Sequence, residues 1–247
     1  MNGFWGCIIG LSGGYLGGLV GVGGGIIMVP LMTWLVRFTQ HQAHGTSLVA
    51  IVFTGLVGAG IYALHGTVDW KAALILAATA IFTARYGALY AHSLADKKLK
   101  KAFGVFLVSI SMILLAKRFF LGNIYELDGW LKIAIFLFTG AVSGFISGMM
   151  GVGGGGLMVP LMVLLAGMEQ HVAQGTSLLV MVPAGMIGAI THYRLGNVRS
   201  KIVWGLAAGA IAGGYLGAMS ANLLPGLYLT LIFCGFAAWM GLRYIRV

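Results

Sequence analysis

The stretch GVGGGIIMVPLM at residues 21–32 returns as GVGGGGLMVPLM at residues 151–162, with ten of twelve letters identical. A second pair lies at the same offset of 130 residues, because QHQAHGTSL at 40–48 matches QHVAQGTSL at 170–178 in seven of nine letters. The second match excludes a chance cluster of glycines. The chain is therefore an internal duplication, and each copy carries a glycine tract inside an apolar segment.

The composition excludes a water-soluble fold. Of 247 residues, 60% are hydrophobic and 8% are charged, whereas about a quarter of the residues in ordinary soluble domains are charged. The apolar runs are continuous rather than alternating in polarity, which favours helices over strands in the membrane. We predict an all-α polytopic membrane protein. The net charge of +10 does not indicate a nucleic-acid partner, because the basic residues lie mainly in short connections between spans.

The apolar segments number four in each repeat, and we place the repeats at residues 1–122 and 131–247. The segments cover residues 3–36, 45–65, 70–93, 101–116, 131–166, 175–193, 202–222 and 226–242. The first segment of each repeat is too long for one span, and its glycine tract is followed by Pro30 or Pro160. Glycine weakens a helix interior and proline favours a helix start, so we expect two helical pieces joined at the glycines.

The charges of equivalent connections reverse between the repeats. Residues 95–101 carry four lysines while 223–226 carry no charge, and 194–201 carry three basic residues while 64–71 carry one, balanced by Asp69. This predicts two inverted repeats, each with a re-entrant first segment and three spanning helices. With both termini inside, ten basic residues lie on the cytoplasmic side and four outside, against at best nine and five for eight single crossings.

Both repeats combine the tract GVGGG, a Val-Pro pair four residues downstream, a short polar link and the hexapeptide AxGTSL. This combination resembles the sulfite exporter TauE/SafE family of membrane transporters, and the resemblance covers nearly the whole chain. It implies transport of sulfur-containing anions, such as sulfite or organosulfonates, across the cytoplasmic (inner) membrane. Export is the direction that the family implies.

The residues independently indicate an anion site. A glycine tract that breaks a helix leaves N–H groups without partners at the start of the next helix, and these groups attract an oxyanion. The alternative role for these glycines is close helix packing. The threonines and serines after Gly45 and Gly175 are expected at the next helix start, where they bind substrate oxygens or cap the helix. The expected substrate-binding residues are thus Gly23, Gly24, Gly25, Thr46, Ser47, Gly153, Gly154, Gly155, Thr176 and Ser177.

Arg85 is a further candidate ligand. It lies nine residues before Leu94 at the end of its segment, roughly 13 Å along a helix, and a buried arginine is costly unless it faces a polar cavity. The alternatives are that its side chain reaches toward Lys97 or pairs with a backbone carbonyl. All five carboxylates lie in connections, so we do not expect a sodium or proton site on a buried acid.

The sequence gives no pattern for an enzyme, a metal or a cofactor. The letters GxGxxG at residues 151–156 lack a βαβ context, and the pair His41 and His44 is not repeated, since Gln174 replaces the second histidine. We therefore expect a secondary transporter that works by alternating access around a midplane site. A passive anion channel is the alternative. The expected partners are a small sulfur-containing anion and membrane lipid, and the sequence indicates no oligomeric state.

Overall fold

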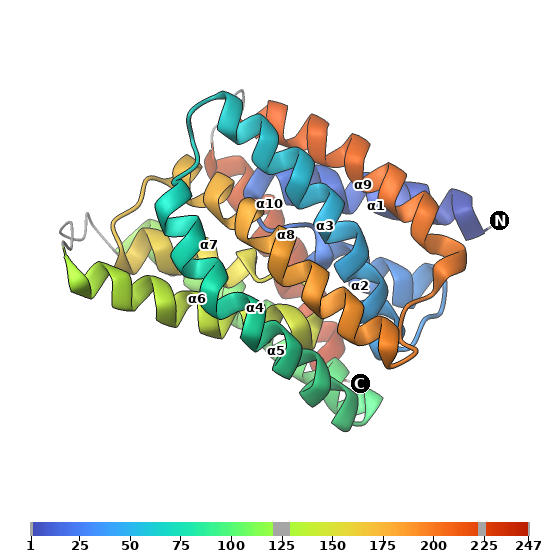
Figure 1. Ribbon diagram of the computed structural model, residues 1–247. Coiled ribbons are helices and arrows are strands. Elements are labelled where there is room, and N and C mark those ends of the chain that lie inside the picture. Colours follow the sequence, from blue (N-terminus) through green and yellow to red (C-terminus); the bar gives the residue numbers. More distant parts are fainter. Residues whose placement is uncertain (1, 121–128, 222–225, 247) are drawn as a thin grey trace.

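The computed structural model describes residues 2–120, 129–221 and 226–246 of the chain. Regular structure in these ranges is entirely α-helical, with five helices in each repeat. In chain order (Figure 1) they are α1 (Asn2–Val20), α2 (Gly25–Leu35), α3 (Gln40–Leu64), α4 (Trp70–Ser93), α5 (Asp96–Phe120), α6 (Trp130–Met150), α7 (Gly155–Leu165), α8 (Gln170–Arg194), α9 (Ser200–Ala221) and α10 (Gly226–Ile245). The predicted boundary between the repeats falls largely on residues 121–128, outside the described ranges.

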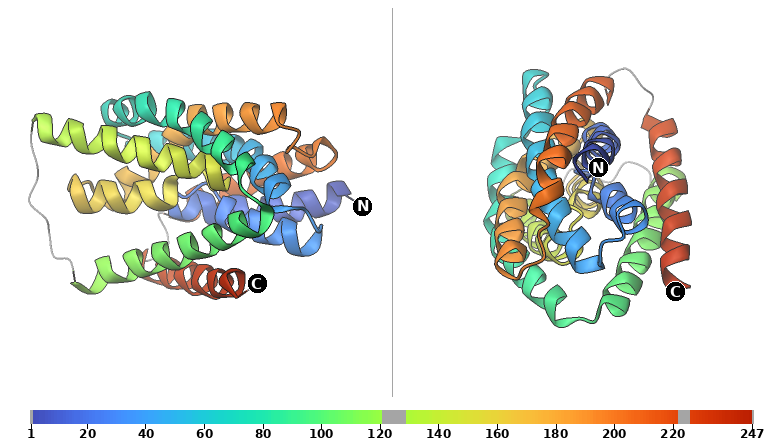
Figure 2. Two further views of the ribbon diagram at one scale, coloured as in Figure 1. Left: turned by 90° about the horizontal axis from the view of Figure 1, so that it is seen from below. Right: turned by 90° about the vertical axis from the view of Figure 1, so that its right-hand side faces the viewer.

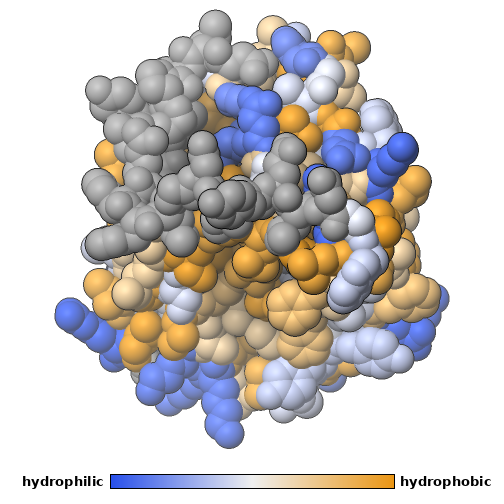
Figure 3. All heavy atoms as spheres, turned by 90° about the vertical axis from the view of Figure 1, so that its left-hand side faces the viewer, coloured by the Kyte–Doolittle hydropathy of each residue, from blue (hydrophilic) through white to orange (hydrophobic). Residues whose placement is uncertain are grey.

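Six helices of the described ranges are long and apolar enough to cross a bilayer, namely α1, α3, α4, α6, α8 and α9. Many of their large apolar side chains face outward, and Trp204 of α9 is 80% exposed. Figure 3 views the bundle from its end, where hydrophilic side chains gather toward the edge and apolar ones lie between them. Such an apolar surface is suited to lipid rather than to water. The predicted all-α multi-pass membrane fold is confirmed.

The first apolar segment of each repeat is a hairpin of two unequal helices. The first arms have 19 and 21 residues and the second arms 11 each, which makes them about 30 Å and about 16 Å long. Gly13 of α1 lies against Met28 of α2, so the short arm packs back on the long one. Figure 2 shows each short helix running back toward the end at which its long partner begins. The predicted break at the glycine tract is confirmed.

The glycines, and not the prolines, set the start of each short helix. The N-cap residues Gly24 and Gly154 have φ values of 84° and 76°, in the left-handed region that side chains with a Cβ disfavour. Pro30 and Pro160 lie inside α2 and α7 and do not begin these helices. Each proline instead removes one backbone bond from the second turn, because it has no N–H.

The two repeats share one interior, because the main helix pairs join one repeat to the other. The first helix of each repeat packs along the fourth helix of the other, α1 on α9 and α6 on α4. The third helices pair as α3 with α8, and the fifth as α5 with α10. Glycines permit the close approach of the backbones. Those facing α9 are Gly6, Gly10, Gly14 and Gly18, and those facing α4 are Gly140, Gly144 and Gly148.

Helices α3 and α8 lie antiparallel at the centre of the bundle. Gly45, near the start of α3, lies against His192, near the end of α8. Gly175, near the start of α8, lies against Tyr62, near the end of α3. Each contact is the counterpart of the other at the repeat offset of 130 residues. This reciprocity is the pattern expected of an interface with two-fold symmetry.

Candidate binding site at the glycine tracts

The two glycine tracts meet in the interior. All six glycines at 23–25 and 153–155 are buried. Gly25 lies against the backbone of residues 151 and 152, and Gly155 lies against the backbone of residues 21 and 22. The starts of the two short helices are therefore held together by contacts that cross between the repeats. The sequence predicted such a meeting of the tracts but not the direct contact of their backbones.

Two buried side chains lie against both tracts, and sequence reasoning missed them. A Cβ on Gly23 or on Gly153 would meet the same two residues, Ile51 of α3 and Met181 of α8. Both side chains have 0% exposed surface, and they are equivalents at the repeat offset of 130. The available signal was their position four residues after Ser47 and Ser177, on the same helix face.

The serines of the GTS tripeptides join the tracts across the repeats. The Ser47 hydroxyl donates to the Gly151 carbonyl and the Ser177 hydroxyl donates to the Gly21 carbonyl, each at 2.6 Å between oxygens. Their helices begin earlier than predicted, at Gln40 and Gln170. The expectation that they cap these helices is therefore wrong. Both side chains are fully buried, and the single hydroxyl proton of each is shared with a second, more distant carbonyl in its own helix, at 2.9 Å for Ser47 and 2.8 Å for Ser177.

The threonines of the same tripeptides receive bonds from the other repeat. The Thr46 hydroxyl accepts from the backbone N–H of Arg199 at 3.1 Å, and the Thr176 hydroxyl accepts from that of Asp69 at 3.0 Å. Asp69 is the N-cap of α4 and Arg199 directly precedes α9. The threonines thus hold the starts of the opposing helices. The true N-cap of α3 is Thr39, which forms a capping box with Gln42.

The starts of α2 and α7 can interact with an anion through their backbones. Their N-cap residues are glycines, which have no side chain to accept a hydrogen bond from the first N–H groups. The first backbone bonds within these helices run from Ile27 to Gly24 and from Leu157 to Gly154. The N–H groups of Gly25 and Gly155 come before them and have no preceding helical turn to bond. Two positive helix ends are therefore buried close together in the described part of the bundle.

Arg85 does not lie where the sequence suggested. Its side chain is exposed on α4, whereas Ala84, Gly87 and Ala88 beside it are buried. Gly87 lies against the backbone of Phe145 in α6, so the buried face of α4 is the face of small residues. The expectation of a buried arginine in a polar cavity is wrong, because the packed surface of this helix excludes long side chains. Arg85 is thus not among the residues that the structure brings together around the tracts.

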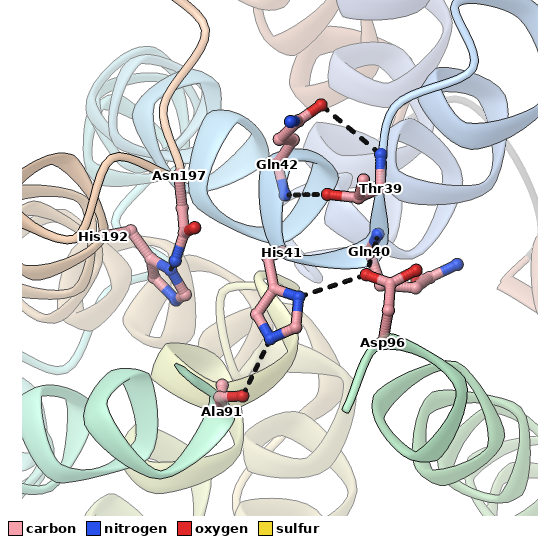
Figure 4. A network of polar contacts seen from close by, with 8 residues as sticks. All are labelled: Thr39, Gln40, His41, Gln42, Ala91, Asp96, His192 and Asn197. Atoms are coloured by element: carbon pink, nitrogen blue, oxygen red, sulfur yellow. Dashed lines mark hydrogen bonds and ion pairs between the residues drawn. The ribbon is translucent and has the colours of Figure 1, made fainter. Parts of the chain in front are cut away.

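A polar network lies at the end of the bundle where α3 begins (Figure 4). The Asp96 carboxylate accepts from the N–H of Gln40 at 2.8 Å, and the same carboxylate oxygen lies within hydrogen-bond distance of His41 Nδ1, at 3.1 Å. The other ring nitrogen of His41 lies 3.1 Å from the Ala91 carbonyl. Asp96 thus ties the start of α5 to the start of α3. Sequence reasoning placed Asp96 in a connection without assigning it this contact.

Known proteins resemble this chain along most of its length. The family model described as "Sulfite exporter TauE/SafE" matches residues 6–244. "Probable membrane transporter protein YunE" of Bacillus subtilis (strain 168) is 33% identical, and the match covers 85% of this chain and 85% of the relative.

Two further relatives carry similar names. A "Probable membrane transporter protein" of Xylella fastidiosa (strain 9a5c) is 31% identical over 85% of this chain and 83% of its own. "Probable membrane transporter protein MJ0441" of Methanocaldococcus jannaschii is 29% identical over 79% of this chain and 73% of its own. No solved structure matches the chain.

Proposed function

The chain belongs to the TauE/SafE family and is a multi-pass membrane transporter, and from this premise we propose that it carries small sulfur-containing anions such as sulfite or organosulfonates. The proposed location is the cytoplasmic (inner) membrane, and the proposed direction is export. The chemistry of the interior supports an anionic cargo. Two buried helix starts offer backbone N–H groups, and the described carboxylates Asp69, Asp96 and Glu169 lie at helix ends or between helices.

The proposed mechanism is alternating access between two repeats of opposite orientation in the membrane. The antiparallel pairing of α3 with α8 supports it, as do the reciprocal bonds from Ser47 to Gly151 and from Ser177 to Gly21. In such a mechanism the repeats move against each other around the bound anion. The side chains of Ile51 and Met181, packed against both tracts, would then shift to admit it.

The observation that carries the proposal is the meeting of the two tracts, with their helix starts, in the interior. We test it by reconstituting the purified protein in liposomes and measuring uptake of radiolabelled sulfite against a load of unlabelled sulfite. We expect saturable uptake that is accelerated by counterflow. A flux that does not saturate and shows no counterflow would instead indicate a passive channel, and an absence of sulfite, thiosulfate and taurine flux would refute the proposal.

A pair of glycine variants tests the site itself. In Gly154→Ala the new methyl group would lie 2.7 Å from the Ser143 carbonyl oxygen, in addition to the strain of a positive φ. Gly66→Ala shares that strain, since its φ is 70°, but meets no atom within 4 Å. We expect folded Gly154→Ala protein to lose most transport and Gly66→Ala to retain it. Wild-type uptake by folded Gly154→Ala would remove the tract from the site.

A further inference from the structure

One face of α6 carries hydroxyl groups that the fold does not use. Thr139, Ser143 and Ser147 are spaced by four residues and are at most 1% exposed. Their hydroxyl oxygens have no hydrogen-bond partner in the described part of the chain. A buried hydroxyl without a partner is unfavourable. Serines and threonines in helices usually donate to a carbonyl one turn back, as Ser111 does to Leu107 at 2.8 Å in this protein.

These hydroxyls lead to the start of α7. The Cβ of Ser147 is 3.3 Å from the position that a Cβ on the N-cap Gly154 would occupy, and the Ser143 carbonyl is 2.7 Å from the same position. Ser143 lies one turn before Ser147 on this face and Thr139 lies one turn before Ser143. The three residues therefore form a row about 12 Å long that ends beside Gly154, the N-cap of α7.

The first repeat does not contain this row. The equivalents of the three residues in α1 are Ile9, Gly13 and Gly17. A Cβ on Gly17 would overlap the backbone of Gly23 and Gly24, so no side chain fits between α1 and the start of α2. Since Ser147 does carry a side chain at the matching place, a serine of α6 borders the start of α7, where α1 presents only the backbone of glycines to the start of α2.

The duplicated glycine stretch also differs between the repeats in the size of one side chain. Position 26 of the first tract is isoleucine and position 156 of the second is glycine. Gly156 lies in the first turn of α7, where the lack of a side chain allows close approach to the backbone. A Cβ on Gly156 would lie 3.0 Å from Ile26 Cδ1 and 3.3 Å from Val22 Cγ1, so the larger residue at position 26 packs where the second repeat has its glycine.

We propose that the second repeat alone provides the oxyanion site, formed by the hydroxyls of Ser143 and Ser147 with the first N–H groups of α7, and that Thr139 lies on the path to it. This inference rests on the proposed function and narrows it to one of the two helix starts. The ligand class is a small oxyanion such as sulfite. Hydroxyl and backbone N–H groups suit it because they donate hydrogen bonds without the strong attraction of a fixed cation.

The test measures binding and stability together on purified, full-length protein. Ser143→Ala and Ser147→Ala should each weaken sulfite binding by about 10- to 100-fold, the loss of a hydrogen bond to a charged group. Their melting temperatures should be equal to or above that of the wild type, since each removes an unpartnered buried hydroxyl. The matched control is Ser111→Ala, equally buried but bonded within its own helix, and it should bind as the wild type does.

The outcomes separate this inference from the proposed function. If wild-type protein binds sulfite and both serine variants bind it equally well, the inference fails and the proposed function stands. If binding is lost only together with a lower melting temperature, the serines are structural and the inference fails. If the wild type binds none of sulfite, thiosulfate and taurine, the proposed function fails as well.

The path is tested by a matched pair at one residue. Thr139→Val keeps the shape of the side chain and removes the hydroxyl, whereas Thr139→Ser keeps the hydroxyl. We expect the valine variant to lower the maximal transport rate several-fold without weakening sulfite binding, and the serine variant to behave like the wild type. Equal rates in the two variants would remove Thr139 from the path.

Discussion

The serine hydroxyls that join the two tracts should contribute measurably to stability. Ser177→Ala removes the donor to the Gly21 carbonyl, which lies 2.6 Å away, and leaves that buried carbonyl without this partner. An unsatisfied buried carbonyl costs about 1–3 kcal/mol. The other bond of Ser177, to the Gln174 carbonyl in its own helix, adds little because such bonds are nearly neutral. We expect the free energy of unfolding to fall by about 1–3 kcal/mol.

The assay is equilibrium unfolding of purified protein in detergent micelles, followed by circular dichroism. Ser47→Ala should give a loss of the same size, because its bond to the Gly151 carbonyl is the counterpart of the first. Ser111→Ala is the control, since its hydroxyl donates only within α5, and we expect a change below about 0.5 kcal/mol. If both tract variants unfold like Ser111→Ala, the bonds across the repeats are not what holds the tracts together.

Three further changes test the packing and the surface. Gly148→Leu should prevent folding, because a Cβ there would overlap the Ala84 backbone, whereas a Cβ at Gly60 meets no atom within 4 Å and Gly60→Leu should fold; gel filtration shows which variant is monodisperse and which is aggregated. Arg85→Ala should leave sulfite transport within about twofold, since the side chain is exposed, and a large loss would return Arg85 to the site. Asp96→Ala should lower the free energy of unfolding by about 1 kcal/mol through loss of its bond to the start of α3, while Asp96→Asn, which still accepts that bond, should lower it less. Equal losses in the two Asp96 variants would show that the charge, and not the accepted hydrogen bond, matters.

The sequence predicted the features that depend on the duplicated motif and on the glycine interruptions of its apolar segments. The duplicated tract predicted both hairpins, and the long apolar runs predicted a helical membrane protein. The sequence did not predict that Arg85 is exposed. In a membrane helix such as α4 the face toward lipid is as apolar as the face toward the protein, so hydrophobic periodicity does not distinguish them. The small residues Ala80, Ala84, Gly87 and Ala91 did mark its buried face, and membrane helices pack through such residues.

The side chains around the tracts were harder to predict. Ile51 and Met181 carry no chemistry that a motif would reveal, and only the antiparallel crossing of α3 and α8 brings them together. Ser143 and Ser147 look like ordinary small residues of a packed helix. Their lack of hydrogen-bond partners among the described residues is visible only once the surrounding backbone is in place.

The pairing of the long helices with partners from the opposite half bears on how such a chain arises. Bonds that appear twice, from Ser47 to Gly151 and from Ser177 to Gly21, are those that two identical polypeptides would form on association. If the repeats have the opposite orientations proposed above, an ancestor half this size that worked as a homodimer needed copies inserted in both directions. Fusion into one chain removes the requirement that the halves be identical, and they differ where Gly13 and Gly17 of the first correspond to Ser143 and Ser147 of the second.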